Sequence, residues 1–178
     1  MDTLWTEREA GRGQAAPPVT GLDLGVIAAY AAGILAFGYA LVSVYWALGG
    51  QGLLSTVGGF AEQAANQGGA GAVLLGLVAA AAKVAGGLLA LALVRQWGRV
   101  IPRLGLLIAS AAASVLLVVY GGLNVLGGVL VLSGAYHPSG NVDRTALRWH
   151  AGVWDLWFLI WGILMVIATV SYWRRTAR

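Results

Sequence analysis

The sequence predicts an all-α integral membrane protein, folded as a bundle of four transmembrane helices with both termini in the cytoplasm. Three observations predict this fold class: the composition, four long apolar runs, and the distribution of basic residues between those runs. Hydrophobic residues make up 59% of the 178-residue chain and charged residues 10%, whereas soluble domains contain about 25% charged residues. We therefore expect most of the chain to be in contact with lipid.

Each of the four apolar runs is long enough to cross the hydrocarbon core of a bilayer, which needs about 20 helical residues. The predicted spans cover about 24–48, 70–94, 104–132 and 149–173. Open strands are excluded at this depth, because their backbone groups would have no partners in lipid. The predicted transmembrane domain is therefore 22–178, and the polar segment 1–21 is predicted to be a disordered cytoplasmic tail.

The segments between the spans have recognisable local patterns. The first span follows Thr20-x-x-Asp23, which resembles a helix-capping box. In the Gly- and Gln-rich loop that comes next, 53–65 has apolar residues at helical spacing and predicts a short interfacial helix. A tight basic turn, 95–103, joins the second and third spans, and 133–147 is a loop with turn-forming residues.

Basic residues outside the spans predict the orientation. The N-terminal tail contains two of them, the turn after the second span three and the C-terminal tail three, whereas the loop before the fourth span contains two and the loop after the first none. Because cytoplasmic segments carry an excess of Lys and Arg, both termini are expected in the cytoplasm. The expected location is the plasma membrane, with a multi-pass topology.

Composition also excludes several functions. The chain has no cysteine, which excludes disulfide exchange, thiolate metal sites and thioether-linked haem. Its basic residues flank the spans and form no single cluster, so no nucleic-acid partner is expected. No catalytic residue, metal or cofactor is predicted, and enzymatic activity is left open.

Polar residues at membrane depth are the candidates for function, because each is costly there without a partner. Lys83 lies roughly 20 Å from the outer end of its predicted helix, near the midplane. A charge at that depth costs on the order of 3 kcal/mol. Asp155 is the acidic residue in the outer half of a span, but its predicted depth differs by roughly 12 Å, which favours a shared polar cavity over a tight ion pair.

Other polar and aromatic side chains are predicted at similar depth. Tyr120 and Asn124 are four residues apart and share a helix face. The aromatic stripe that continues from Trp154 to Trp161 is either packing or the apolar wall of a lipid, quinone or carotenoid pocket. The full set expected to line the cavity is Lys83, Asp155, Asn124, Tyr120, Tyr39, Ser43, His150 and Trp154.

Several short motifs carry a family resemblance. They are Tyr45-Trp46-Ala-Leu-Gly49-Gly50, Leu54-Ser-Thr-Val-Gly58, Tyr120-Gly121-x-x-Asn124 and Arg148-Trp149-His150-Ala-Gly-Val-Trp154-Asp155. From the first span to the last, the chain resembles the small bacterial membrane proteins catalogued as domain of unknown function 3995. The resemblance implies four spans and no assigned activity.

Two functional hypotheses follow. The sequence favours a structural or accessory subunit that docks on a membrane partner, with polar residues that only fix the register of the helices. The alternative is a binding or transport-like protein with an outward-facing polar cavity for a small polar or anionic ligand. The expected partners are the lipid bilayer and either another membrane protein or a second copy of the chain.

Overall fold

The computed structural model describes residues 23–140 and 142–177, and in these ranges it contains helices and no strand. The predicted tail, 1–21, lies outside the described residues. The elements in chain order are α1 (Leu24–Ala47), η1 (Leu54–Thr56), α2 (Gly59–Gln67), α3 (Gly69–Ala92), η2 (Gln96–Val100), α4 (Arg103–Leu132), α5 (Arg144–Trp149), η3 (His150–Trp154) and α6 (Asp155–Thr176). The last three elements follow one another directly, and η3 is a π-helical segment between two α-helices.

Four helical segments are long and apolar enough to cross a membrane. The prediction of an all-α fold with four such segments is therefore confirmed, while insertion and orientation remain predictions. The last segment begins at Arg144, ahead of the predicted start at 149. The reason is a local cap: the carboxylate of Asp143 accepts hydrogen bonds from the backbone N–H groups of Thr145 and Ala146, which stabilises an earlier helix start.

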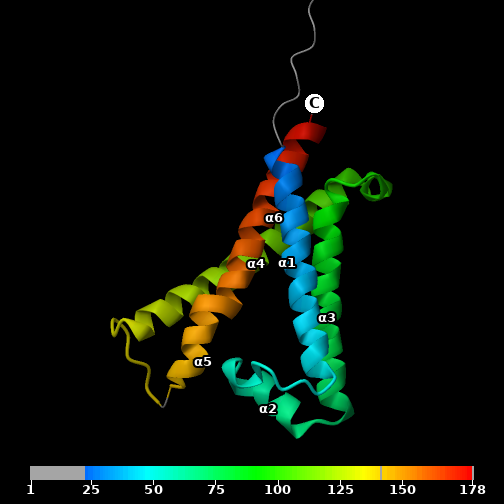
Figure 1. The fold of residues 1–178 in the computed structure, drawn as a ribbon. Coiled ribbons are helices and arrows are strands. Elements are labelled where there is room, and N and C mark those ends of the chain that lie inside the picture. Colours follow the sequence, from blue (N-terminus) through cyan, green and yellow to red (C-terminus); the bar gives the residue numbers. More distant parts are fainter. Residues whose placement is uncertain (1–22, 141, 178) are drawn as a thin grey trace, which may run out of the picture.

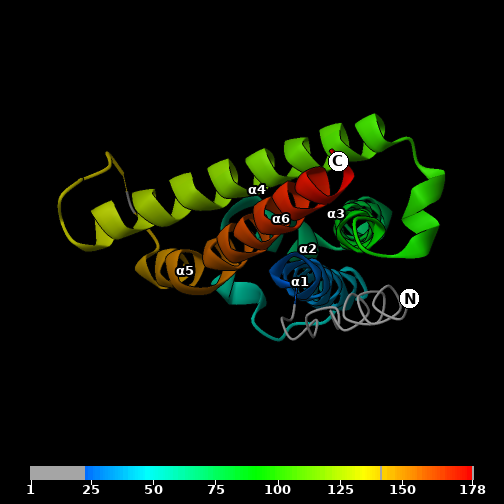
Figure 2. The same ribbon diagram turned by 90° about the horizontal axis from the view of Figure 1, so that it is seen from above.

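The four long helices form two pairs. α1 packs along α3 and α6 packs along α4, and contact between α1 and α6 joins the pairs. α3 and α4 have little contact with each other and diverge from the η2 turn that connects them (Figure 1). Seen from above, α6 lies between α4 and α1 (Figure 2). The bundle is therefore open on the side between α3 and α4.

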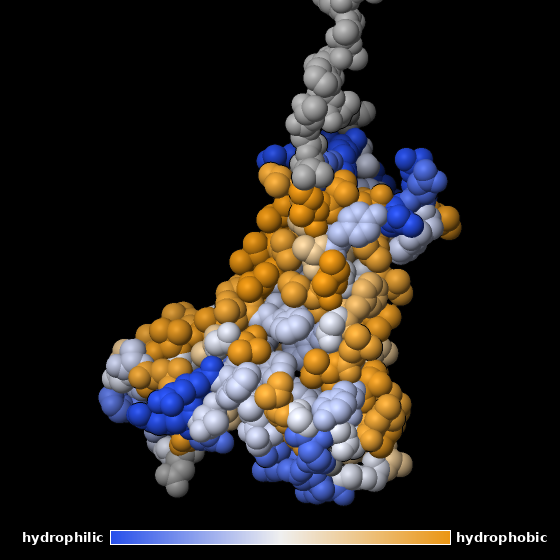
Figure 3. All heavy atoms as spheres, viewed as in Figure 1, coloured by the Kyte–Doolittle hydropathy of each residue, from blue (hydrophilic) through white to orange (hydrophobic). Residues whose placement is uncertain are grey.

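The two ends of the bundle differ in charge. At the basic end, where η2 also lies, the guanidinium of Arg175 donates a hydrogen bond to the carboxylate of Asp23 over 2.7 Å. The hydrogen bond from the backbone N–H of Gly25 lowers the pKa of the Asp23 carboxyl below its usual value. Burial acts in the opposite direction, and the guanidinium of Arg175 lowers the pKa further. The loop end carries α2 and the start of α5. Between these polar ends the visible surface is mainly apolar (Figure 3), as expected for a chain in contact with lipid.

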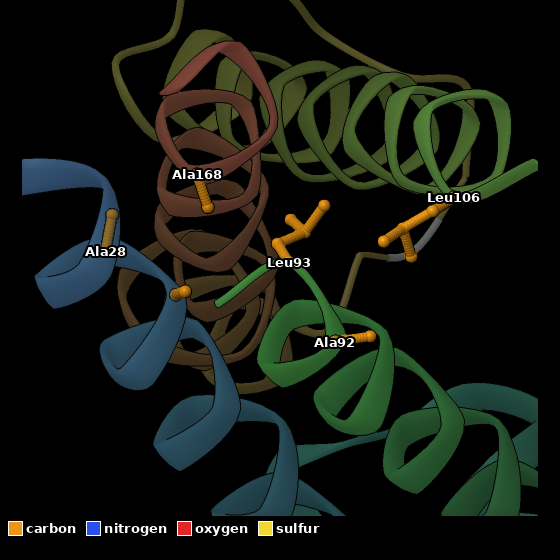
Figure 4. Close-up of a cluster of buried hydrophobic side chains, with 6 residues drawn as sticks. Ala28, Ala92, Leu93, Leu106 and Ala168 are labelled. Atoms are coloured by element: carbon orange, nitrogen blue, oxygen red, sulfur yellow. The ribbon is translucent and has the colours of Figure 1, made fainter. Parts of the chain in front are cut away.

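Small residues allow the helices to approach closely. Near the basic end, the buried side chains of α1, α3, α4 and α6 meet in one cluster (Figure 4), formed by Ala28, Ala29, Ala92, Leu93, Leu106 and Ala168. A second cluster contains Ala32, Ala36, Ala90, Trp161 and Met165. α4 and α6 touch through their backbones, because a Cβ atom on Gly121 would lie 2.5 Å from the backbone nitrogen of Leu159. This packing fixes the positions of the side chains that form the candidate site.

Candidate binding site around Lys83

A cavity of about 560 Å³ lies between α1, α3 and the segment that contains η1 and α2. We call it the loop-end cavity. α1 contributes aromatic and hydroxyl groups to its wall, η1 and the residue after it contribute aliphatic side chains, and α3 contributes small residues. Its lining includes Tyr39, Ser43, Trp46, Leu54, Val57, Gly76, Ala79 and Lys83. Its size is within the range of about 300–1,000 Å³ that is typical of ligand pockets.

Lys83 contributes an ammonium group to this cavity. It lies fourteen residues after Gly69, the first residue of α3, or roughly 21 Å along the helix axis. Side chains of a helix lean toward its N-terminus, and Nζ of Lys83 accordingly donates to the carbonyl oxygen of Ala79, at 3.4 Å. The ammonium therefore points toward the loop end and not toward the basic end.

Two aromatic rings also lie close to this ammonium. Nζ of Lys83 lies 4.7 Å from the ring centroid of Tyr39 and 6.0 Å from that of Phe158. Two ion pairs occur among residues 23–140 and 142–177, and neither involves Lys83. In the described part of the chain, no carboxylate lies within 4.0 Å of this ammonium. Lys83 is thus held by aromatic faces and one long hydrogen bond.

Asp155 is instead paired with His150. Nδ1 of His150 lies 3.0 Å from Oδ2 of Asp155, and Nε2 of the same ring lies 2.7 Å from the carbonyl oxygen of Val57. A carboxylate and a carbonyl are both acceptors, so a proton on each ring nitrogen satisfies both contacts. The geometry therefore fits an imidazolium that bridges the buried Asp155 carboxylate and the η1 segment.

Trp154 forms a second connection between the η1 segment and the helices. Its indole N–H donates to the hydroxyl oxygen of Thr56 over 3.1 Å, and its ring stacks on Tyr39 with a centroid distance of 5.7 Å. Tyr39 in turn lies beneath the ammonium of Lys83. A continuous row of contacts therefore leads from Thr56 through Trp154 and Tyr39 to Lys83. We call the side chains of His150, Asp155 and Trp154, together with the Thr56 hydroxyl and the Val57 carbonyl, the latch.

The chain matches one protein family over most of its length. The family model described as protein of unknown function (DUF3995) matches residues 36–165. The chain belongs to this family. The DUF3995 match includes all residues of the loop-end cavity and the latch named above. No curated protein and no solved structure is similar enough to the chain to count as a match.

The eight predicted site residues fall into three places within the DUF3995 region. Tyr39, Ser43 and Lys83 line the loop-end cavity. His150, Asp155 and Trp154 form the adjoining latch. The structure brings these two groups together through the ring of Tyr39.

Tyr120 and Asn124 lie elsewhere. They line a shallow groove on α4, together with aliphatic residues of that helix. Tyr120 is 48% exposed, and the amide nitrogen of Asn124 donates to the carbonyl oxygen of Tyr120 over 2.7 Å. The Tyr120 ring contacts Phe158 edge-on, but neither residue lines the loop-end cavity.

Sequence reasoning missed three contributors to the site. They are the hydroxyl of Thr56, the carbonyl of Val57 and the ring of Phe158. Thr56 and Val57 are inside the motif Leu54-Ser-Thr-Val-Gly58, which the family resemblance singled out. The apolar residues of this loop predict that it packs on the outer end of the bundle, but no pattern in the motif indicates hydrogen bonds from Thr56 and Val57 to side chains of η3. Among residues 23–140 and 142–177, no three His, Cys, Asp or Glu side chains gather closely enough to hold a metal ion.

Proposed function

We propose that the protein binds a small anionic ligand in the loop-end cavity, with the ammonium of Lys83 as the charged contact. The observation that carries the proposal is the position of this ammonium: it borders a cavity near mid-span and has no carboxylate within 4.0 Å in the described part of the chain. A bound carboxylate or phosphate supplies the missing counter-charge.

Energies support a ligand at this place. An uncompensated lysine near the centre of a bilayer costs on the order of 3 kcal/mol on insertion scales. A cation–π contact such as that with Tyr39 returns about 0.5–2 kcal/mol. The long bond to Ala79 adds little, because a carbonyl that already accepts within the helix is a weak partner at 3.4 Å. An anion is therefore favoured beside Lys83.

The proposal includes the orientation of the protein in the plasma membrane. Arg95, Arg99, Arg103 and Arg174 belong to the turn and helix end on the same side as Asp23 and Arg175, and an excess of basic residues favours the cytoplasm. The loop-end cavity then opens outward. Reporter fusions at Arg178 and next to Gly68 should report cytoplasm and exterior, respectively; the same side for both would exclude this orientation.

An accessory role is the second candidate function. It is supported by the groove on α4, where Tyr120 is half exposed beside Asn124 and offers a polar contact to another membrane protein. The latch also fits this role, because its polar groups satisfy one another and need no ligand. Substitution of Asn124 would weaken a complex of this kind, whereas substitution of Lys83 would leave it intact.

Thermal unfolding in a zwitterionic detergent tests the binding function. Octanoate at a hundredfold excess over its Kd should stabilise the protein by about 2.7 kcal/mol, which corresponds to a rise in Tm of about 5–10 °C for a chain of this length. Octanol, with the same chain and no charge, should have a much smaller effect. Lys83→Met should remove the octanoate effect, and the matched variant Asn124→Leu should retain it.

The opposite pattern would contradict the proposal. An equal rise in Tm with octanoate for the wild-type protein and Lys83→Met would mean that the carboxylate does not bind at Lys83. An absence of any rise in the wild-type protein would remove the binding function itself.

A further inference from the structure

A second cavity meets the loop-end cavity at Lys83. Its volume is about 290 Å³, and it lies between α3 on one side and α4 with α6 on the other. We call it the lateral cavity. Both cavities are lined by Ala79 and Lys83. Nζ of Lys83 lies 4.7 Å from the ring centroid of Tyr39 in the loop-end cavity and 6.0 Å from that of Phe158 in the lateral cavity, so the ammonium lies where the two cavities adjoin.

The lining of the lateral cavity is apolar apart from Lys83. The other lining residues are Ala, Gly, Leu, Phe, Trp and Met, among them Gly86, Leu117 and Trp161. The absence of a side chain on Gly86 gives the Trp161 ring its room, because a Cβ atom there would lie 2.6 Å from that ring. Such a surface suits a hydrocarbon chain.

The lateral cavity borders the open side of the bundle. α3 and α4 diverge there (Figure 1), and Ala82, which lines the cavity from α3, is exposed. In a bilayer this side faces the hydrocarbon core, because α3 and α4 are both apolar enough to span it. A chain can therefore enter from the membrane while its polar end reaches Lys83.

We infer that the ligand is an amphiphile with an anionic head group and one hydrocarbon chain, such as a long-chain carboxylate. Its head group binds the ammonium of Lys83 at the edge of the loop-end cavity, and its chain occupies the lateral cavity. This inference rests on the proposed function and narrows the ligand to one class. A small inorganic anion leaves the lateral cavity without an occupant, and a neutral lipid leaves Lys83 without a counter-charge.

Quenching of tryptophan fluorescence measures this binding mode. The full-length protein is placed in nanodiscs of neutral phosphatidylcholine and titrated with carboxylates that carry bromine at the end of the chain, from hexanoate to dodecanoate. Trp161 in the wall of the lateral cavity is then close to the quencher. Affinity should rise with chain length, by up to about fourfold for each methylene group that leaves water.

Two matched variants on α3 separate the lateral cavity from its surroundings. Ala82→Phe fills the cavity, whereas Ala85→Phe places the same side chain at an exposed position that lines none of the cavities described here. Ala82→Phe should retain the affinity for hexanoate and lose at least tenfold for dodecanoate, and Ala85→Phe should behave like the wild-type protein. An equal dependence on chain length in the two variants would overturn the inference.

Lys83→Met distinguishes failure of this inference from failure of the proposed function. If Lys83→Met abolishes binding at every chain length while Ala82→Phe changes nothing, anion binding stands and the amphiphile is excluded. If Lys83→Met binds all the carboxylates normally, the proposed binding of an anion at Lys83 and the inference of an amphiphilic ligand are both contradicted. Phosphatidylglycerol in the nanodiscs should not displace bromododecanoate. Displacement would show that the site binds a two-chain membrane lipid and would overturn the inference that the ligand has one hydrocarbon chain.

Discussion

At the scale of single residues, the position of Asp155 depends on a departure from α-helical geometry. His150 and Asp155 are five residues apart, and in an α-helix such residues point about 140° away from each other. The π-helical segment η3 (His150–Trp154), with hydrogen bonds between residues five apart, brings the two side chains within 3.0 Å. The Asp155 carboxylate therefore pairs with His150 and not with Lys83.

A double-mutant cycle tests this assignment of partners. Each of His150→Gln and Asp155→Asn should destabilise the protein by about 1–3 kcal/mol, because each leaves a hydrogen-bonding group of a largely buried pair unsatisfied. The coupling energy between these substitutions should be about 0.5–3 kcal/mol. Lys83→Met and Asp155→Asn should be additive within about 0.5 kcal/mol. Strong coupling of Lys83 with Asp155, measured by unfolding in detergent, would show that they share a site.

For the predicted cavity residues, the sequence predicted the depth of each side chain in the membrane, but not the face of the helix on which it lies. Residue counting predicted that Lys83 and Tyr39 lie deep enough to share a cavity, and both line the loop-end cavity. The same counting included Asn124, which lies on the groove of α4. Each helix is apolar on nearly all sides, so its sequence pattern does not show which face meets the other helices.

At the scale of elements, α4 and α6 cross where glycines remove the side chains between two backbones. A Cβ atom on Gly121 would lie 2.5 Å from the nitrogen of Leu159, and one on Gly162 would lie 2.8 Å from the nitrogen of Val118. Two glycine pairs in α4, at 121–122 and 127–128, are candidates for such close approach. Gly127 faces open space instead, because a glycine pair in a helix presents its members to different sides.

Substitution of these glycines by alanine should distinguish the effect of close helix packing on stability from the effect of helix propensity. Gly121→Ala or Gly162→Ala should destabilise the bundle by about 1–3 kcal/mol, because a backbone must move to admit the methyl group. Gly127→Ala should be neutral or stabilising by up to about 1 kcal/mol, because alanine favours a helix and meets no neighbour there. Unfolding by sodium dodecyl sulfate measures the difference. Similar stabilities for all three variants would contradict the packing of α4 against α6.

The four long helices were predictable because their apolar runs are long, whereas the short elements depended on single capping contacts. The start of α5 follows from the two hydrogen bonds to Asp143, which a hydropathy pattern does not reveal. The π-helical segment η3 could not be predicted either, because hydropathy and capping patterns do not distinguish it from an α-helix. It nevertheless contains both side chains, His150 and Trp154, that form hydrogen bonds with the η1 segment.

At the scale of the whole molecule, the arrangement of the helices gives the protein its cavities. Close pairing of α1 with α3 and of α4 with α6 leaves α3 and α4 apart, so the lateral cavity opens on that side and adjoins the loop-end cavity at Lys83. The sequence predicted four helices but not this pairing, because small residues that permit close approach occur on several helices. The latch closes the loop end over the same cavity, since Val57 both lines it and accepts from His150.

Native mass spectrometry of the protein released from its own membranes in mild detergent tests binding at Lys83 most directly. The account predicts one retained acidic amphiphile for each chain in the wild-type protein and in Asn124→Leu. It predicts none in Lys83→Met, because the methionine keeps the volume and removes the charge that holds the head group. An equal amount of the same adduct in Lys83→Met, or no adduct in any of the three proteins, would contradict the assignment of Lys83 as the anion-binding residue.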